Sequence, residues 1–319
     1  MDLKELPDIS APLPWHTSQW QRFNQQIQEQ KLPHAILLAG VAHTGASRLA
    51  LALSRLLLCH QPSGGLNCGQ CQGCKLSASG SHGDFMWLQP EEGSRVIKID
   101  QVREAVGLAH QTAGFGSRKV IAIAPADTMN ISSANALLKS LEEPSPGTHL
   151  ILVCNQLHSI VPTIRSRCQI VKLATPEPDQ SLPWLDALTG DRAQSENLLE
   201  LCDGLPLLAE SMYRDQDAAE VHAVRLACRG LFSGQVSAEK AIGVLSKAET
   251  EEMLDQFYMS AQARTRTLDR GQLAGPGGRR IFALMDEVGT IRRAVGGGAN
   301  PNRQLLAEVL VAKAQDVLG

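Results

Sequence analysis

Four cysteines in the first quarter of the chain have the spacing of a metal site. They follow the pattern C-x8-C-x2-C-x2-C and are Cys59, Cys68, Cys71 and Cys74. Four thiolates suit one tetrahedral zinc ion, and such a closed site leaves no open position for catalysis. An iron–sulfur run would continue with a further cysteine and a proline, whereas KLSAS follows here. The spacing therefore predicts a structural zinc module over residues 59–74, with redox-active C-x-x-C pairs as the alternative.

A second segment, GVAHTGAS at residues 40–47, matches the phosphate-binding loop of nucleotide hydrolases except for its lysine. A functional loop reads G-x-x-x-x-G-K-[ST], in which backbone N–H groups face the phosphates and the lysine reaches the outer ones. Gly40, Gly45 and Ser47 fit this pattern, and Ala46 stands at the lysine position. The segment is therefore a nucleotide site, a relic of one, or a chance group of small residues.

The acidic residues that such a hydrolase needs after a later strand are also missing. An aspartate must hold Mg²⁺, and a further residue must position the attacking water. After the apolar run VIAI the chain has Ala124 and Pro125 instead. Asp127 follows two residues later, and we expect it in a loop or turn beyond the strand. Both halves of the site are thus predicted to be degenerate, and no ATP is expected in this chain's own site.

A third segment resembles the AAA+ clamp-loader family. NALLKSLEEP at 135–144 matches the family's helix N-A-L-L-K-x-L-E-E-P, and Ser166, Arg167 and Cys168 match its S-R-C triplet. In that family the triplet's arginine reaches into the ATP site of a neighbouring subunit. The resemblance covers about the first 175 residues closely, and the C-terminal helices match the family's oligomerisation collar loosely. An intact triplet beside empty nucleotide motifs implies a non-hydrolysing stator subunit of the bacterial DNA polymerase III clamp loader, with Arg167 acting in trans.

The same resemblance implies partners and a structural zinc module. The partners are the other AAA+ loader subunits, gamma/tau and delta, with the sliding clamp and primed DNA contacted through the complex. Two alternatives remain, an active AAA+ ATPase with atypical motifs and a zinc-dependent DNA-binding protein. Ala46, Ala124 and Pro125 argue against the first alternative, and the lack of lysine and arginine within 59–74 argues against the second.

Three other polar residues near these motifs have weaker signals. Glu142 and Glu143 are adjacent at the predicted end of a helix, so their side chains diverge, and we expect capping or surface roles for them. Asn155 matches a polar sensor position of the family. Because no phosphate is expected here, Asn155 is predicted to be structural.

Three continuous apolar runs predict the strands that position these residues. They lie at 34–40, 120–125 and 149–155, and such runs are typical of strands buried on both faces of a parallel sheet. Helical patterns separate them, one at 46–59 and one at 132–144 with Ser132 or Ser133 as its N-cap. The alternation predicts a doubly wound α/β domain of the AAA+ kind.

Composition divides the chain into three predicted regions. Residues 1–175 form the AAA+ domain with the zinc module at 59–74, and a proline-rich segment at 174–183 begins a small helical lid domain, 176–212. Residues 213–319 have no strand pattern and predict a helical oligomerisation collar. Apolar residues recur there at helical spacing on both sides of GGGANPN at 296–302, namely Ile281, Leu284, Met285, Val288 and Ile291, then Leu306, Val309, Leu310 and Val317.

The overall composition fits a folded protein without an obvious nucleic-acid surface. Of the 319 residues, 43% are hydrophobic and 20% are charged, and the formal net charge is −3. This composition excludes a disordered chain, and the charge does not indicate autonomous nucleic-acid binding. The segment MDLKELPDIS lacks the apolar core of a secretory signal. We therefore expect a cytoplasmic protein whose eight cysteines are reduced.

Overall fold

The computed structural model describes residues 7–91, 93–94, 96–214, 218–296 and 299–318. By their internal contacts these residues form two compact units. The first comprises the described residues of Met1–Arg192 together with Gly204–Leu208, and the second those of Ala193–Asp203 and Ala209–Gly319. This grouping divides 176–212 between the two units, and a separate lid domain stays a prediction.

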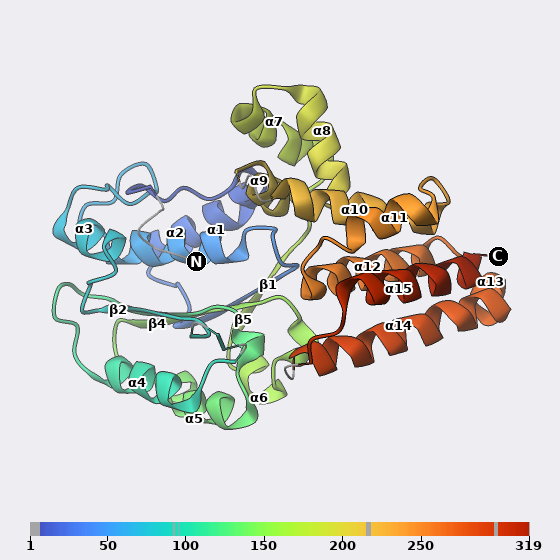
Figure 1. Ribbon diagram of the computed structural model, residues 1–319. Helices are drawn as coiled ribbons and strands as arrows, with labels where there is room; N and C mark the ends of the chain where they lie inside the picture. The colour runs from blue at the N-terminus through green and yellow to red at the C-terminus, as the bar shows by residue number, and fades with distance from the viewer. Residues whose placement is uncertain (1–6, 92, 95, 215–217, 297–298, 319) are drawn as a thin grey trace. The chain divides into compact units, whose positions relative to one another are not determined.

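The first unit is built on a five-stranded parallel sheet in the order β2-β3-β4-β1-β5 (Figure 1). Its register places Leu37 of β1 opposite Leu152 of β4 and Ile170 of β5. The strands are β1 (Ala35–Gly40), β2 (Phe85–Leu88), β3 (Lys119–Ile123), β4 (Thr148–Cys154) and β5 (Gln169–Leu173). The three predicted strands are confirmed within one or two residues at each end.

Helices cover both faces of this sheet, as the doubly wound prediction requires. Figure 1 shows α2 (Ala46–Leu58) on one face and α4 (Ile99–His110) with α5 (Ile131–Glu142) on the other. Successive strand residues point to opposite faces. Ile36 and Leu38 therefore pack in the core that contains α2, while Ala35 and Leu37 pack in the core that contains α4 and α5. Burial on both faces explains why these strands are continuously apolar.

Two features of the first unit differ from the sequence prediction. Strands β2 and β5 were not predicted, because β2 has only four residues and β5 alternates between buried and exposed positions at the sheet edge. The predicted N-cap of the helix before Pro144 was wrong. The helix begins at Ile131, and the Asn130 side chain caps it by accepting from the Ser133 N–H at 2.8 Å. Ser132 and Ser133 both lie inside the helix.

The remaining elements of the first unit are short or wholly helical. They are the 3₁₀ turns η2 (Pro14–His16), η3 (Ala126–Thr128) and η4 (Leu157–Ser159), and the helices α1 (Thr17–Gln28), α3 (Gln72–Ala78), α6 (Pro162–Arg165) and α7 (Pro178–Thr189). Of these, η2, η3, α3 and α6 carry residues of the candidate sites.

Among its described residues the second unit contains helices joined by turns and loops, with no strand. Its core includes Leu284 and Val288 of α14 and Leu306 and Leu310 of α15, whereas Val309 is exposed. The helices, some of which begin in the first unit, are α8 (Arg192–Leu201), α9 (Pro206–Arg214), α10 (Ala218–Ser233), α11 (Ala238–Leu245), α12 (Thr250–Arg266), α13 (Arg270–Ala274), α14 (Pro276–Gly296) and α15 (Arg303–Leu318). In the part of the chain that the structure describes, no helix is both long and apolar enough to cross a membrane.

Candidate functional site

The four predicted cysteine ligands come together in the first unit. Cys59 caps the C-terminus of α2, Cys68 lies in the following loop, Cys71 caps the N-terminus of α3 and Cys74 lies in its first turn. Their sulfur atoms all lie within 4.8 Å of one another. The Sγ atoms of Cys59 and Cys71 are 3.9 Å apart, as are those of Cys68 and Cys74. Sulfurs bound tetrahedrally to one zinc at ~2.3 Å would be ~3.8 Å apart, so the observed distances fit a four-sulfur zinc site.

Each of the four sulfurs also accepts a hydrogen bond from nitrogen. The backbone N–H of Cys68 donates to Cys59 at 3.2 Å, that of Cys71 to Cys68 at 3.4 Å, and that of His60 to Cys71 at 3.4 Å. Backbone N–H groups lower the pKa of Cys68 to about 6, whereas burial raises the pKa of Cys59 to about 12. A dication among the sulfurs would offset the desolvation of the Cys59 thiolate.

Asn67 completes this cluster and was not identified from the sequence. Its side chain is 2% exposed. The Nδ2 atom donates to Cys74 Sγ at 3.6 Å and to the Asp8 carbonyl at 2.7 Å, and Oδ1 accepts from the Ser10 N–H at 2.9 Å. Asn67 thus joins the cysteine cluster to the N-terminal segment. The sequence shows that Asn67 is adjacent to Cys68, but it does not indicate the long-range hydrogen bonds to Asp8 and Ser10.

The loop at 40–47 connects β1 to α2, as a phosphate-binding loop would, but its carbonyl groups are engaged. The His43 carbonyl accepts from the Leu207 N–H at 3.1 Å. The Thr44 carbonyl accepts from the Trp15 indole N–H at 2.8 Å in a buried contact. A functional loop instead directs backbone N–H groups at a phosphate. Two carbonyls of this loop are therefore held by donors from other parts of the first unit.

Residues of the N-terminal segment cover the same loop. A Cβ atom added to Gly45, whose φ is +99°, would lie 2.2 Å from Leu13 Cδ1 and 3.2 Å from His16 Cε1. Trp15 packs edge-on against Trp184 of α7 with ring centroids 5.5 Å apart. Burial lowers the pKa of His16 to about 4, so its imidazole is neutral at pH 7. Leu13, Trp15 and His16, here called the N-terminal cover, thus pack directly on the loop.

The edge where a hydrolase would hold its metal is also different here. Ala124 and Pro125 follow β3, and Asp127 lies in η3. The two carboxylate oxygens of Asp127 accept from the backbone N–H groups of Asn155 at 3.2 Å and Gln156 at 3.1 Å. Asp127 therefore lies in a turn, as predicted, and links the segments that follow β3 and β4. The Asn155 backbone, rather than its side chain, makes this link.

Arg167 lies just beyond α6 with its side chain 35% exposed. Its Nη2 atom is 2.7 Å from the carboxylate of Glu142, the last residue of α5. Its Nη1 atom donates to the Thr163 carbonyl at 3.0 Å and to Ser166 Oγ at 3.2 Å. The surface position predicted for Glu142 is correct, but its pairing with Arg167 was not predicted. The neighbouring Cys168 is buried enough to raise the pKa of its thiol to about 12, so it stays protonated.

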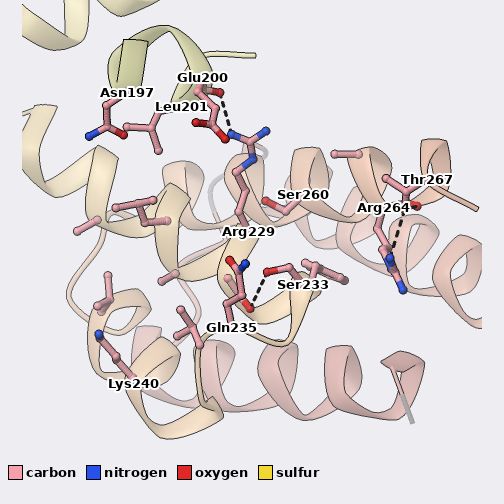
Figure 2. Close-up of a pocket in the computed structure, with 18 residues that line it drawn as sticks. Asn197, Glu200, Leu201, Arg229, Ser233, Gln235, Lys240, Ser260, Arg264 and Thr267 are labelled. Atoms are coloured by element: carbon pink, nitrogen blue, oxygen red, sulfur yellow. Dashed lines mark hydrogen bonds between the residues drawn. The ribbon is translucent and has the colours of Figure 1, made fainter. Parts of the chain in front are cut away.

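A separate cavity of about 740 Å³ lies wholly within the second unit, among α8, α10, α11 and α12 (Figure 2). None of the sequence-predicted site residues lines it. Two of its charged side chains contact the protein itself, since Arg229 donates to the Glu200 carbonyl at 3.0 Å and Arg264 to Thr267 at 3.3 Å. The cavity is therefore not connected with the chemistry that the sequence predicts.

Comparisons with known proteins find similarity in both sequence and fold. Residues 15–177 match the family described as DNA polymerase III, delta subunit. The chain is 35% identical to DNA polymerase III subunit delta' of Pseudomonas aeruginosa over 322 residues, which cover 94% of this chain and 96% of that protein. It is 36% identical to the Escherichia coli protein of the same name over 172 residues, 54% of this chain and 52% of that protein.

One solved structure extends the comparison to three dimensions. A DNA polymerase III, gamma subunit-related protein from Thermotoga maritima superposes with a TM-score of 0.52 at 19% identity, covering 93% of this chain and 99% of that one. At this identity the likeness concerns the fold alone. Together with the five-stranded parallel sheet, it confirms the predicted fold, a doubly wound α/β domain followed by helices.

Proposed function

Because this chain belongs to the DNA polymerase III subunit delta' family, whose members are subunits of the polymerase's clamp loader, we propose that it is a stator that binds no nucleotide. In this proposal it assembles in the cytoplasm with the gamma/tau and delta subunits and supplies Arg167 to a neighbouring subunit's ATP. The complex then loads the sliding clamp on primed DNA. Contacts with clamp and DNA are made by the assembly.

The closed loop at 40–47 is the observation that carries the non-hydrolysing role. Trp15 and Leu207 hold two of its carbonyls, and Leu13 packs on Gly45. A nucleotide would find no lysine at position 46, and these contacts restrain the loop in its present conformation. Since a buried carbonyl that loses its donor costs about 1–3 kcal/mol, any rearrangement of the loop that breaks the Trp15–Thr44 contact is unfavourable.

Arg167 supports the second half of the proposal. A guanidinium group presents a rigid fork that fits two phosphate oxygens, which a lysine cannot match. An arginine supplied in trans can accelerate phosphoryl transfer by about 10³- to 10⁵-fold. A subunit can therefore take part in hydrolysis while its own loop stays closed.

The decisive experiment is ATP hydrolysis by the reconstituted loader with sliding clamp and primed DNA. Arg167→Ala should assemble normally and lower the DNA-stimulated rate, with a partial loss because other subunits keep their sites. Arg165→Ala, which removes an arginine two residues away, is the matched control and should hydrolyse ATP normally. An Arg167→Ala complex with the wild-type rate would exclude the role in trans. Turnover by the isolated chain that Ser47→Ala abolishes would instead indicate an active ATPase.

For the cysteine cluster we propose one structural zinc ion. It would join the end of α2 to the start of α3, and Asn67 would connect this module to the N-terminal segment. Metal analysis should find close to one zinc per chain, which Cys71→Ala should release while hydrogen exchange increases within 59–74. Cys168→Ala, a cysteine outside the cluster, should keep its zinc. Iron, or no metal in the wild-type chain, would contradict this assignment.

A further inference from the structure

The Arg167–Glu142 pair joins two segments that are 25 positions apart in the sequence. We propose that Glu142 is a positioning residue that holds the Arg167 guanidinium in the orientation needed at the neighbouring subunit's ATP. This inference rests on the proposed function of Arg167. It assigns a role to a carboxylate that is expected, from its sequence alone, only to cap a helix or face solvent.

The contacts of Arg167 fix the orientation of its guanidinium group and leave some of its N–H donors available. Glu142 holds Nη2 at 2.7 Å, and the Thr163 carbonyl and Ser166 Oγ hold Nη1 at 3.0 and 3.2 Å. Ser166 is itself held, because its hydroxyl donates to the Thr163 carbonyl at 3.0 Å. A guanidinium has five N–H donors. The three contacts occupy at most three of them, so at least two remain for phosphate oxygens.

The position of Glu142 in α5 does not favour a role in stabilising that helix. The C-terminus of a helix carries a partial negative charge, so a carboxylate in its last turn is unfavourable. Glu142 is the last residue of α5, and Glu143 adds a second carboxylate at the C-cap. The favourable contact of Glu142 is the one with Arg167. Removing its charge should therefore leave α5 as stable as before or slightly more stable.

The exposure of the pair indicates that it acts on orientation more than on folding. The side chains of Arg167 and Glu142 are 35% and 48% exposed, and solvent-exposed ion pairs contribute little to stability. A long arginine side chain has many rotamers, and each one that points away from the phosphate lowers the rate. The contacts that hold Nη1 and Nη2 reduce the number of rotamers that Arg167 can adopt before it meets the neighbouring subunit's ATP.

A double-mutant cycle in the reconstituted loader tests this inference. Glu142→Gln should lower the kcat of DNA-stimulated ATP hydrolysis about threefold, the size expected for the loss of a partly exposed charge pair. The KM for ATP should stay nearly unchanged. Glu142→Ala, which also removes the hydrogen-bond acceptor, should lower kcat further. In an Arg167→Ala background Glu142→Gln should have no additional effect, because it acts through that arginine.

Glu143→Gln is the matched control, since it removes the adjacent carboxylate that has no contact with Arg167, and it should hydrolyse ATP at the wild-type rate. Complex assembly and zinc content should be equal in all variants, and the unfolding midpoint should not fall in any of them. If Arg167→Ala lowers the rate while Glu142→Gln leaves it unchanged or raises it, the positioning role is wrong and the proposed function stands. If Glu142→Gln lowers the rate equally in the wild-type and Arg167→Ala backgrounds, the positioning role is also wrong and the proposed function stands. If Arg167→Ala has no effect, both proposals are wrong.

Discussion

The loop at 40–47 and the segment at 162–168 belong to the same compact unit, but they differ in how exposed their polar groups are. In the loop, the carbonyls of His43 and Thr44 accept from the N–H groups of Leu207 and Trp15, and the N-terminal cover packs on Gly45. In the segment, the Arg167 guanidinium is exposed and oriented by three acceptors. Buried, satisfied groups contribute to folding, whereas exposed groups with free donors can serve a ligand.

This contrast separates stability from activity in a way that mutations can measure. Substitutions in the loop should lower the free energy of unfolding and leave the assembled complex active. Substitutions at Arg167 should lower activity and leave unfolding unchanged. Any variant that breaks this separation would show that the two regions are coupled.

Arg167→Lys should have the largest effect on activity. Lysine keeps the positive charge but loses the planar fork, so the rate at the neighbouring ATP site should fall by about 10²-fold. Its free energy of unfolding should change by less than about 0.5 kcal/mol, as expected for an exposed side chain. Single-turnover ATP hydrolysis by the assembled loader and chemical denaturation of the isolated chain check the two halves. A lysine variant with full activity would mean that charge alone suffices.

Gly45→Ala should have the largest effect on stability. Its φ of +99° disfavours any side chain, and the new Cβ would lie 2.2 Å from Leu13 Cδ1. We expect the free energy of unfolding to fall by about 2–3 kcal/mol, from left-handed strain and displacement of a packed leucine. Gly190→Ala is the matched control, because Gly190 has a φ of +72° and no atom within 4 Å of the added Cβ. An equal loss in both variants would mean that the N-terminal cover packs loosely.

Acidification should weaken the N-terminal cover through His16. Burial lowers its pKa from 6.5 to about 4, so between these values the unfolded chain binds a proton that the folded chain does not. The His16 contribution is therefore fully present above pH 6.5 and is lost as the pH falls toward 4. Between pH 7.5 and pH 5 the loss is about 2 kcal/mol.

His16→Phe, which cannot titrate, isolates this contribution from that of the other histidines. The wild-type chain should lose more stability than His16→Phe over the same pH interval, measured by denaturant unfolding at each pH. Identical pH dependence in the two proteins would mean that the His16 imidazole stays hydrated in the folded state.

Short sequence patterns predicted the central strands of the sheet and the cysteine cluster. Buried strands such as β1 are apolar on both faces, and the C-x8-C-x2-C-x2-C spacing identified the four cysteines whose sulfurs lie within 4.8 Å of one another. Edge strand β5 was missed because two of its five residues are exposed, which interrupts the apolar run. β3 begins at Lys119, a charged residue outside the apolar run. Its amino group is buried, lies 3.8 Å from Asp84 and donates to the Leu108 carbonyl at 2.9 Å.

The contacts that close the loop were beyond sequence analysis for a different reason. They join residues far apart in the chain, as Trp15 to Thr44 and Leu207 to His43. The missing lysine predicted that the loop binds no nucleotide, but only the fold identifies what covers it. The same holds for Glu142 and Arg167, whose pairing depends on how α5 and α6 pack.

Restoring the missing lysine should have the smallest effect on nucleotide binding, and because Ala46 is buried it should also lower the free energy of unfolding. Ala46→Lys would complete the pattern G-x-x-x-x-G-K-S, yet we expect no measurable nucleotide binding. Leu13 of the N-terminal cover still packs on Gly45, and a lysine at position 46 does not remove it. The strand end still offers Ala124 and Pro125 in place of a magnesium ligand. Calorimetric titration with MgATP should give no Kd tighter than about 1 mM, beside an ATP-binding AAA+ subunit as positive control. A micromolar Kd would mean that only the lysine was needed to restore nucleotide binding. It would also mean that a phosphate can displace the N-terminal cover from the loop.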